Sequence, residues 1–285
     1  MKKLLVFGEV LFDLFEEKAE IGGAPFNVAA HFSALGGRAD FVSAVGRDEL
    51  GQRALDAVRS FQIGDRFVAL TDSPTGYCKV TLKDGTPSYD LKNHVAYDAI
   101  PFPEEIRAED YGALYYGSLA CRNSASFKTL KRLIPLCSER FFDINIRPPY
   151  SDRDTIRELL FAATTLKISR EEADEICPYY NEEQYLHDVI NAFPNIQKIL
   201  FTMDKDGSLL FDAGKDTILY APKPKEKPLS TVGAGDSLSA CYLYHTFKGS
   251  APERTLEACS TLADFVITRL GAVPALPKEL KAQIV

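Results

Sequence analysis

The sequence predicts an α/β protein in which helices cover both faces of a mostly parallel central sheet, with a small second sheet beside it. Short apolar runs alternate with helical patterns along the 285 residues, and this alternation is typical of a parallel sheet. One segment breaks the alternation with the pattern of a β-hairpin. Two glycine clusters each precede a long apolar segment, which indicates two buried helices with tightly turned starts.

Six short apolar runs have the length expected of buried strands. They are Leu4–Phe7, Ala39–Val45, Ala113–Tyr116, Arg140–Ile144, Thr164–Ile168 and Ile199–Thr202. No internal repeat or Pro/Ser-rich linker divides the chain. We therefore expect residues 1–285 to form a single domain.

Helical patterns lie between several of these runs. Phe26–Leu35 ends in two glycines, a common stop signal. In Leu50–Phe61 the apolar residues recur on one face. Ser124–Ile134 follows Asn123, a residue type that caps helix starts.

The segment "TGYCKVTLKDGTPSYDL" (Thr75–Leu91) predicts a hairpin. Cys78, Val80 and Leu82 alternate with polar residues, and "KDGT" supplies a turn. Leu11–Phe15 and its continuation to Ile21 could add further strands. We expect a small lid sheet formed by about 10–21 and 73–100; the alternative is an ordinary antiparallel edge of the main sheet.

Composition excludes several classes of function. With 33 basic and 40 acidic residues the net charge is −7, and no basic stripe is present. Nucleic-acid and anionic-membrane partners are therefore disfavoured. The first apolar run has four residues, too few for a signal peptide, and the six cysteines contain no C-x-x-C pair. These features predict a reduced cytoplasmic protein without a zinc site or disulfide framework.

A lone carboxylate marks the first glycine cluster. In "KPLSTVGAGDSLSACYLYHTFK" (Lys227–Lys248), Asp236 is the only charged residue between the terminal lysines. Gly233, Ala234 and Gly235 precede it, and a buried helix start with free N–H groups is a natural anion site. Asp236 either caps this helix start, or it accepts the proton of a hydroxyl that attacks phosphorus. The motif alone leaves both open.

The second cluster is "IGGAPFNVAAHFSALGG", in which Gly22 and Gly23 precede another buried helix that carries Asn27 near its start. Upstream, Asp13 interrupts the apolar "VLFDLF". Polar groups in apolar surroundings need partners, and sugar hydroxyls would serve. The alternatives are a capping role for Asn27 and a surface position on an edge strand for Asp13. Neither a G-x-x-x-x-G-K-[ST] loop nor a G-x-G-x-x-G motif after a strand is present.

With both clusters in view, the chain resembles the ribokinase-like (PfkB) family of sugar kinases, and within it the bacterial fructokinases. The likeness covers nearly the whole chain. The motifs that carry it are "GEVLFD" (Gly8–Asp13), "GGAPFNVAAHFSALGG" (Gly22–Gly37), "GSLACR" (Gly117–Arg122), "FDINIRPP" (Phe142–Pro149), "LKISREE" (Leu166–Glu172) and "TVGAGDSLSA" (Thr231–Ala240). The resemblance implies a three-layer ribokinase-like fold with a β-sheet lid.

The resemblance also implies roles for individual residues. Asp236 corresponds to the catalytic base, and the backbone of Gly233, Ala234 and Gly235 to the anion hole. The implied substrate contacts are Asp13, Gly22, Gly23, Asn27, Asn145 and Arg147, the last of which could instead form a structural ion pair. The implied ATP contacts are Lys167, Ser169, Glu172, Thr202 and Gly207. Glu172 would also organise Mg²⁺, through water.

The implied activity is ATP-dependent phosphorylation of a sugar, with fructose to fructose 6-phosphate as the expected reaction. The alternatives are a kinase for 2-keto-3-deoxygluconate or a nucleoside, and a non-catalytic sugar-binding regulator. Ser230 stands where the family often has an acid that serves a monovalent cation, so a potassium requirement is doubtful. Asp204 replaces a glycine expected near the nucleotide phosphates. The resemblance further implies a homodimer that forms through the lid.

Overall fold

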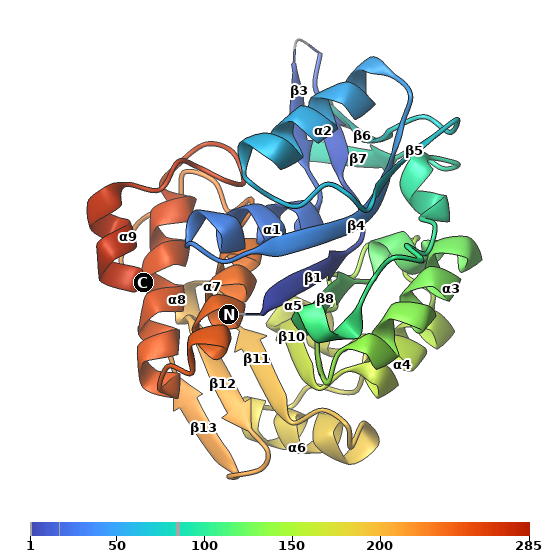
Figure 1. The fold of residues 1–285 in the computed structure, drawn as a ribbon. Coiled ribbons are helices and arrows are strands. Elements are labelled where there is room, and N and C mark those ends of the chain that lie inside the picture. The colour runs from blue at the N-terminus through green and yellow to red at the C-terminus, as the bar shows by residue number, and fades with distance from the viewer. Residues whose placement is uncertain (1, 17, 84–85) are drawn as a thin grey trace.

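The computed structural model describes residues 2–16, 18–83 and 86–285, which form two β-sheets and the helices around them (Figure 1). The central sheet has nine strands in the order β13-β12-β11-β10-β9-β8-β1-β4-β5. All pairings from β5 to β11 are parallel, and β12 and β13 are antiparallel additions at one edge. The predicted fold class is confirmed.

The six predicted strands are all present in the central sheet. Its strands are β1 (Lys3–Phe7), β4 (Ala39–Gly46), β5 (Val68–Thr71), β8 (Tyr111–Gly117), β9 (Glu139–Asp143), β10 (Thr165–Ser169), β11 (Lys198–Thr202), β12 (Ser208–Asp212) and β13 (Thr217–Tyr220). β1 lies between β8 and β4. The first described strand is therefore an interior strand, with β4 and β5 between it and one edge of the sheet.

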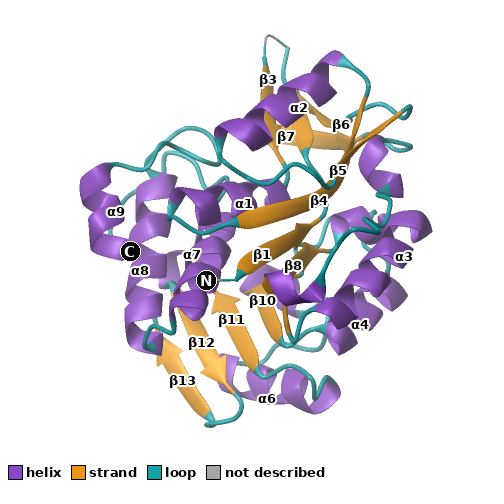
Figure 2. Cartoon of the chain, viewed as in Figure 1, coloured by secondary structure: helices purple, strands orange, loops and turns teal. Residues whose placement is uncertain are grey.

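Helices cover both faces of this sheet, as the purple ribbons of Figure 2 show. One apolar cluster joins the sheet to α1 (Ala24–Ala34), α2 (Glu49–Ser60), α7 (Ala234–Lys248), α8 (Pro252–Ile267) and α9 (Lys278–Ile284). A second cluster, on the other face, joins it to α3 (Ser124–Leu133), α4 (Arg153–Ala162), α5 (Arg170–Ala173) and α6 (Glu182–Ala192). Short 3₁₀ turns are η1 (Ala96–Ala99), η2 (Ala108–Asp110), η3 (Leu119–Arg122), η4 (Ile134–Leu136) and η5 (Asp204–Asp206). Among the described residues, no helix is both long enough and apolar enough to traverse a lipid bilayer.

Two of the described helices, α1 and α7, begin after a glycine with positive φ. α2 and α3 are capped by side chains, since Asp48 accepts from the amide of Gly51 and Asn123 from that of Ala125. α1 and α7 begin after Gly23 and Gly233, with φ of 105° and 81°, and neither has a side-chain cap. Glycine tolerates positive φ without steric cost. The amides at these two starts therefore remain available to other acceptors.

The second sheet has four strands in the order β3-β2-β6-β7, and it continues directly from the carboxyl end of β1. The strands are β2 (Leu11–Leu14), β3 (Ala19–Gly22), β6 (Gly76–Lys83) and β7 (Thr86–Leu91). β2 and β6 pair in parallel, and the other pairings are antiparallel. The alternative of an edge of the main sheet is therefore wrong.

The limits of this small sheet differ from the expected range. Its last strand ends at Leu91, whereas Val95 to Tyr97 and Ile100 are buried against the main body. The predicted turn includes Asp84 and Gly85, which lie outside the described residues.

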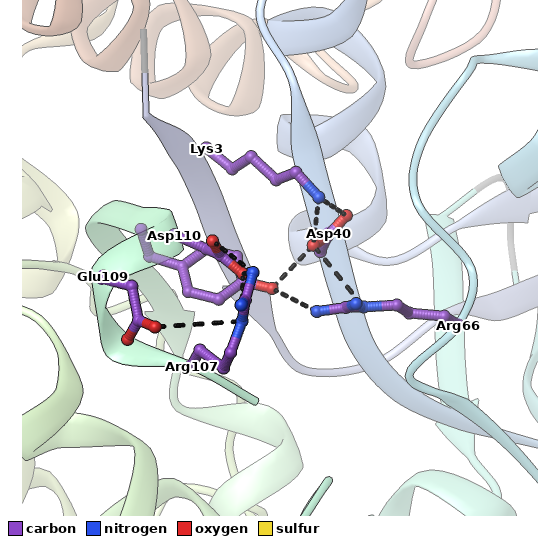
Figure 3. Close-up of polar contacts among 7 residues, drawn as sticks. Lys3, Asp40, Arg66, Arg107, Glu109 and Asp110 are labelled. Carbon is purple, nitrogen blue, oxygen red and sulfur yellow. Dashed lines mark hydrogen bonds and ion pairs between the residues drawn. The ribbon is translucent and has the colours of Figure 1, made fainter. Parts of the chain in front are cut away.

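At the amino ends of the parallel strands, a buried carboxylate ties three strands together (Figure 3). Asp40, at the start of β4, accepts from Lys3 Nζ at 3.0 Å and from the hydroxyl of Tyr111 at 2.6 Å. The guanidinium of Arg66 approaches it at 4.0 Å. Beside this group, Arg107 pairs with Asp110 at the surface. The cluster lies at the amino ends of the parallel strands, whereas the two glycine-led helix starts lie at the carboxyl ends. We interpret it as a structural contact that holds the strands together.

Candidate active site

The two glycine-led helices meet through a side-chain hydrogen bond. Asn27 Nδ2, on α1, donates to Asp236 Oδ2, on the first turn of α7, at 2.8 Å. Asn27 is buried and Asp236 is partly exposed. Because the amide of Asn27 bonds another helix, and because α1 has no side-chain cap, the capping alternative for Asn27 is wrong. Two motifs that are 209 residues apart thus form one site.

The environment of Asp236 raises the pKa of its carboxyl group to about 6. Burial is the main cause, and the negative charge of Asp143 adds to it. The hydrogen bond from Asn27 and the positive charges of Lys167 and Arg147 lower the pKa and partly compensate. A carboxylate with a pKa close to, but below, neutral pH is ionised when it is needed and holds a proton more strongly than an ordinary aspartate.

The start of α7 provides amides next to this carboxylate. Within the described chain, the amide of Ala234 bonds the carbonyl of Thr231 at 3.3 Å, and the amides of Gly235 and Asp236 have no acceptor. Gly233 is packed so closely that a Cβ there would collide with the backbone of Ala272. Glycine is thus required at 233 by its conformation and by its close contact. The free amides sit at the positive end of the helix dipole, where an anion is favoured.

Lys167 adds a positive charge at the same place. Its Nζ lies 2.9 Å from Asp143 Oδ1, and it would be 3.2 Å from a Cβ placed on Gly235. Burial would lower the pKa of Lys167, but Asp143, Glu172 and Asp236 outweigh it and raise the pKa, so the amine stays charged. Lys167, an expected nucleotide contact, thus lies beside the first turn of α7, the turn that carries Asp236.

The expected substrate residues surround the base of the small sheet. Asp13 lies on β2, in the interior of that sheet, with Oδ2 at 3.5 Å from where a Cβ of Gly22 would stand. The edge-strand alternative for Asp13 is therefore wrong. Burial raises its pKa, Glu20 raises it further, and Arg147 lowers it. A Cβ on Gly23 would lie 2.7 Å from the carbonyl oxygen of Glu9, so only glycine fits between β3 and α1.

Arg147 and Asn145 follow the end of β9. Arg147 is exposed, and it lowers the pKa of three carboxyl groups around the site, those of Asp13, Asp236 and Glu9. Within the described residues it forms no close ion pair, and this observation disfavours the structural alternative. Asn145 has a φ of 42°, and its carbonyl accepts from Ser118 Oγ at 3.2 Å.

The expected nucleotide residues gather at the carboxyl ends of β10 and β11. Ser169 and Thr202 are register partners on these neighbouring strands. Glu172 accepts from the amide of Ser169 at 3.0 Å and from that of Ile146 at 2.8 Å. It therefore fastens the loop after β9 to the end of β10. Gly207 has a φ of 94° in the turn after β11, and Asp204 in the same turn is exposed, with a φ of 54°.

The side chains at the site decide whether it could hold the Mg²⁺ that the family resemblance implies. Within 2–16, 18–83 and 86–285, no group of three or more histidine, cysteine, aspartate or glutamate side chains could hold a metal ion. Mg²⁺ at nucleotide sites is usually held by one or two carboxylates together with phosphates and water. Glu172, partly exposed beside Ser169, fits such an ion bound mainly by the nucleotide.

A separate cavity of about 500 Å³ lies between the loop ahead of α7 and the helices α8 and α9. It contains none of the expected site residues. Its lining consists of Lys225, Glu226, Thr261, Asp264, Phe265, Thr268, Arg269 and Gln283.

Two acidic residues of the site were not predicted. Glu9 follows β1 and is 2% exposed; burial raises its pKa to about 7, with a contribution from Asp236. Asp143 ends β9 and is 1% exposed. Glu9 follows the run Leu4–Phe7 after one glycine, and Asp143 lies near the end of the run Arg140–Ile144, so both stand at the carboxyl end of a parallel strand. That position is a usable signal, because ligands of open α/β sheets bind at this edge.

Comparison with known proteins identifies the family. The model of the pfkB family carbohydrate kinase matches residues 1–279. Fructokinase-2 of Zea mays is 27% identical, over 97% of this chain and 92% of that protein. Aminoimidazole riboside kinase of Salmonella typhimurium is 25% identical, over 97% of this chain and 92% of that protein.

Solved structures share the fold over their whole length. Fructokinase from Vibrio cholerae O395, with bound fructose, ADP and calcium ion, superimposes with a TM-score of 0.82 at 22% identity, covering 100% of this chain and 99% of the other. Fructokinase from Xylella fastidiosa, with bound ATP, gives 0.83 at 21% identity, covering 100% and 98%. These structural similarities establish the architecture. The two sequence relatives differ in the acceptor that their names give, fructose in one and aminoimidazole riboside in the other.

Proposed function

Because the chain belongs to the pfkB family of carbohydrate kinases, we propose that it transfers the γ-phosphoryl group of ATP to fructose, giving fructose 6-phosphate. The hydrogen bond between Asn27 and Asp236 carries the proposal, since it puts a carboxylate of raised pKa at a helix start with free amides. The fructokinase among the sequence relatives supports fructose as the acceptor.

Asp236 acts as the general base. Asn27 holds its Oδ2, and within the described residues no further hydrogen bond engages the carboxylate. The other oxygen can therefore accept the proton of the attacking hydroxyl at neutral pH, where the group is ionised. Asp13, Gly22, Gly23, Asn145 and Arg147 would orient the sugar so that this hydroxyl points at the phosphorus.

Phosphoryl transfer depends mainly on in-line positioning and on neutralising charge. The amides at the start of α7 and the ammonium of Lys167 supply positive potential where the transferred group passes. Mg²⁺ carried by the nucleotide would neutralise further charge, and Glu172 is the residue placed to hold its water. Ser169, Thr202 and Gly207 would line the nucleotide side. We place this enzyme in the cytoplasm, because all six cysteines are free.

A second candidate acceptor is a riboside, because a relative of similar identity is an aminoimidazole riboside kinase. Both acceptors present a primary hydroxyl to the same base. The choice between them depends on the sugar side of the site, around Asp13 and Arg147.

ATP consumption measured over a panel of sugars, nucleosides and keto-acids tests the proposal. We expect turnover with fructose in the presence of Mg²⁺. Turnover with a riboside or with 2-keto-3-deoxygluconate but none with fructose would refute the fructokinase assignment. Sugar binding without turnover of any acceptor would instead favour a non-catalytic regulator.

A further inference from the structure

Beneath the start of α7 lies a buried ion pair whose acidic member, Asp143, has no role in the mechanism proposed so far. Asp143 and Lys167 are register partners on the neighbouring strands β9 and β10. Lys167 Nζ is 2.9 Å from Asp143 Oδ1, and the two side chains are only 11% and 1% exposed. A buried ion pair contributes little net stability compared with apolar residues of similar size. Its presence at this place therefore calls for another explanation.

Asp143 connects the sheet to the first turns of α7. Its Oδ2 accepts from Ser239 Oγ at 3.0 Å and from the hydroxyl of Tyr115 at 3.2 Å. Ser239 lies on α7, three residues after Asp236, and Tyr115 lies on β8. The carboxylate thus fixes the helix start that carries the base against two strands of the sheet.

Lys167 directs its charge toward the same helix start. Its Nζ lies against the backbone of Gly235, where the absence of a side chain leaves room for the ammonium group. The amine would therefore stand beside a phosphoryl group bound at the free amides of α7.

We propose that Asp143 and Lys167 form a positioning pair for phosphoryl transfer, which holds the start of α7 in place and sets the balance of charge around Asp236. The inference rests on the proposed kinase activity and deepens it. Neither residue exchanges a proton with substrate; Asp143 acts through Ser239 and Lys167, and Lys167 acts through its fixed charge.

Several charged groups face Asp236 from the surrounding elements. Asp143 raises the pKa of Asp236, and Lys167 and Arg147 lower it. Glu9, after β1, also interacts with Asp236. If the pair sets this balance, neutralising Asp143 should lower the pKa of Asp236, and neutralising Lys167 should raise it.

Carbon-13 NMR of protein labelled at the aspartate carboxyl carbons measures this titration without any need for turnover, with Asp236 assigned by the Asp236→Asn variant. We expect Lys167→Met to raise the apparent pKa of Asp236 and Asp143→Asn to lower it, each by about one unit. The proposal would be overturned if Asp236 titrated identically in the wild type, Lys167→Met and Asp143→Asn. It would also be overturned if both variants shifted the pKa of Asp236 in the same direction. Because no acceptor is involved, this result is independent of whether fructose is the substrate.

The double variant Asp143→Asn/Lys167→Met removes both charges and so leaves no lone buried ion. It keeps the test decisive if a single variant fails to fold. We expect a melting temperature near that of the wild type and a loss of kcat of about 10²-fold, with little change in the KM for the sugar. A double variant with wild-type kcat would overturn the proposal.

Asp40→Asn is the matched control. It also neutralises a buried aspartate that is paired with a lysine and a tyrosine, but at the opposite edge of the sheet (Figure 3). We expect it to lower the melting temperature and to leave kcat and the titration of Asp236 unchanged. If Asp40→Asn lost as much kcat as the double variant, the effect on kcat would not depend on the position of the neutralised charge, and the proposal would fail.

Discussion

At the scale of single residues, the site keeps two carboxyl groups in surroundings that favour their neutral forms. Burial raises the pKa of Glu9 to about 7 and that of Asp236 to about 6. Glu9 Oε2 and Asn27 Oδ1 are both buried and lack a hydrogen-bond partner among the described residues. Such groups reduce stability, and they are typical of sites where function requires them.

Asp236→Asn should separate catalysis from stability. The folded-state pKa of about 6 lies above the 3.8 of an ordinary aspartate, so the stability linked to this group is present below pH 3.8 and lost as the pH rises through 6. At pH 7.5 the neutral asparagine should therefore give a melting temperature equal to or above that of the wild type. Turnover should fall by about 10²–10⁴-fold, because asparagine cannot act as a base.

Melting temperature and turnover are measured on the same preparation. A folded variant that keeps more than about a tenth of normal turnover would exclude Asp236 as the base. A role limited to stabilising the helix start predicts the opposite pattern, a loss of about 1 kcal/mol of stability with a nearly normal rate.

Glu9→Gln should change how stability depends on pH. The pKa of Glu9 rises from 4.5 to about 7 on folding, so the stability linked to it is present below pH 4.5 and lost as the pH rises through 7. Glutamine does not ionise. The melting temperature of the variant relative to the wild type should therefore be higher at pH 8 than at pH 5. An equal difference at both values would show that Glu9 is not kept neutral by its burial.

The sequence identified the residues that belong to recognisable motifs, and it missed those that act through contacts distant in the chain. Asp236 and Asn27 stand beside glycine clusters whose local chemistry marks them. Asp143 lies within "FDINIRPP", but that motif does not reveal its partners, which come from β8, β10 and α7. No local pattern contains those pairings, because they depend on how the strands are ordered in the sheet.

At the scale of elements, the glycines ahead of α7 have different tasks. Gly233 has a φ of 81° and touches the backbone of Ala272, whereas Gly235 is helical and faces the end of the Lys167 side chain. A backbone neighbour cannot move aside, but a flexible side chain can. The expected anion hole therefore contains two glycines with different roles. Gly233 is required for folding, and Gly235 leaves space for the ammonium group of Lys167 beside the phosphoryl group.

Gly233→Ala should reduce stability, whereas Gly235→Ala should reduce kcat. Gly233→Ala should lower stability strongly, because it adds a backbone collision to the strain of positive φ. Gly235→Ala should leave stability unchanged or raise it, since alanine favours helices by about 0.5–1 kcal/mol, and it should reduce kcat by displacing Lys167. Thermal unfolding and kcat of both variants distinguish the effects.

Gly249→Ala provides the control for Gly233→Ala. Gly249 ends α7 with a φ of 67°, and its Cβ position has no neighbour within 4 Å. It therefore shows the cost of the conformation alone. A Gly233→Ala variant no less stable than Gly249→Ala would contradict the collision with Ala272.

The loop ahead of α7 should make the rate insensitive to potassium. Ser230 carries no charge, and the amides of Leu229 and Ser230 both donate to the carbonyl of Ile267, at 2.7 and 3.1 Å. This carbonyl is thus already engaged by the loop. Replacing potassium by a bulky organic cation at constant ionic strength should leave turnover nearly unchanged. A several-fold higher rate in potassium would contradict this expectation.

Among the elements, the sequence predicted six strands from their apolar runs and missed three others, β5, β12 and β13. β5 is only four residues long and half-buried, and β13 is partly exposed along its length. β12 pairs with β11 and β13 as an antiparallel meander, without an intervening helix. Edge strands such as β5 and β13 bury less apolar surface, so the pattern that reveals a central strand is weak in them. β12 is buried, but it breaks the alternation of strand and helix on which the prediction relied.

At the scale of the whole molecule, the small sheet is the part whose exposed edges suit a partner. β3 and β7 each pair on one side only within the described sheet, and Phe15 next to β2 is 38% exposed. Open sheet edges and exposed aromatic rings are common at interfaces between subunits.

We expect a homodimer formed through this sheet. Light scattering at micromolar concentration should give about twice the monomer mass of 31.6 kDa, and Phe15→Glu should shift the mass toward the monomer. Tyr220→Glu, on the exposed edge strand β13, is the control and should leave the mass unchanged. A monomeric wild type, or a dimer disrupted only by Tyr220→Glu, would contradict a contact through the small sheet.

The position of β1 in the interior of the sheet has a consequence for biosynthesis. β1 is translated before the other strands of the sheet, but the helices α7 and α8, which belong to the apolar cluster on one of its faces, are translated after all of them. Helix α1 packs on β1, β4 and β8 and is made early. The part of the same apolar face that α7 covers beside Phe141 of β9, and that α8 covers at β12 and β13, must therefore remain open while most of the chain is translated. Incomplete chains with open apolar sheets are prone to aggregate. A nascent chain that stalls before Ala234 should thus be a stronger chaperone client than one that stalls after Ile267.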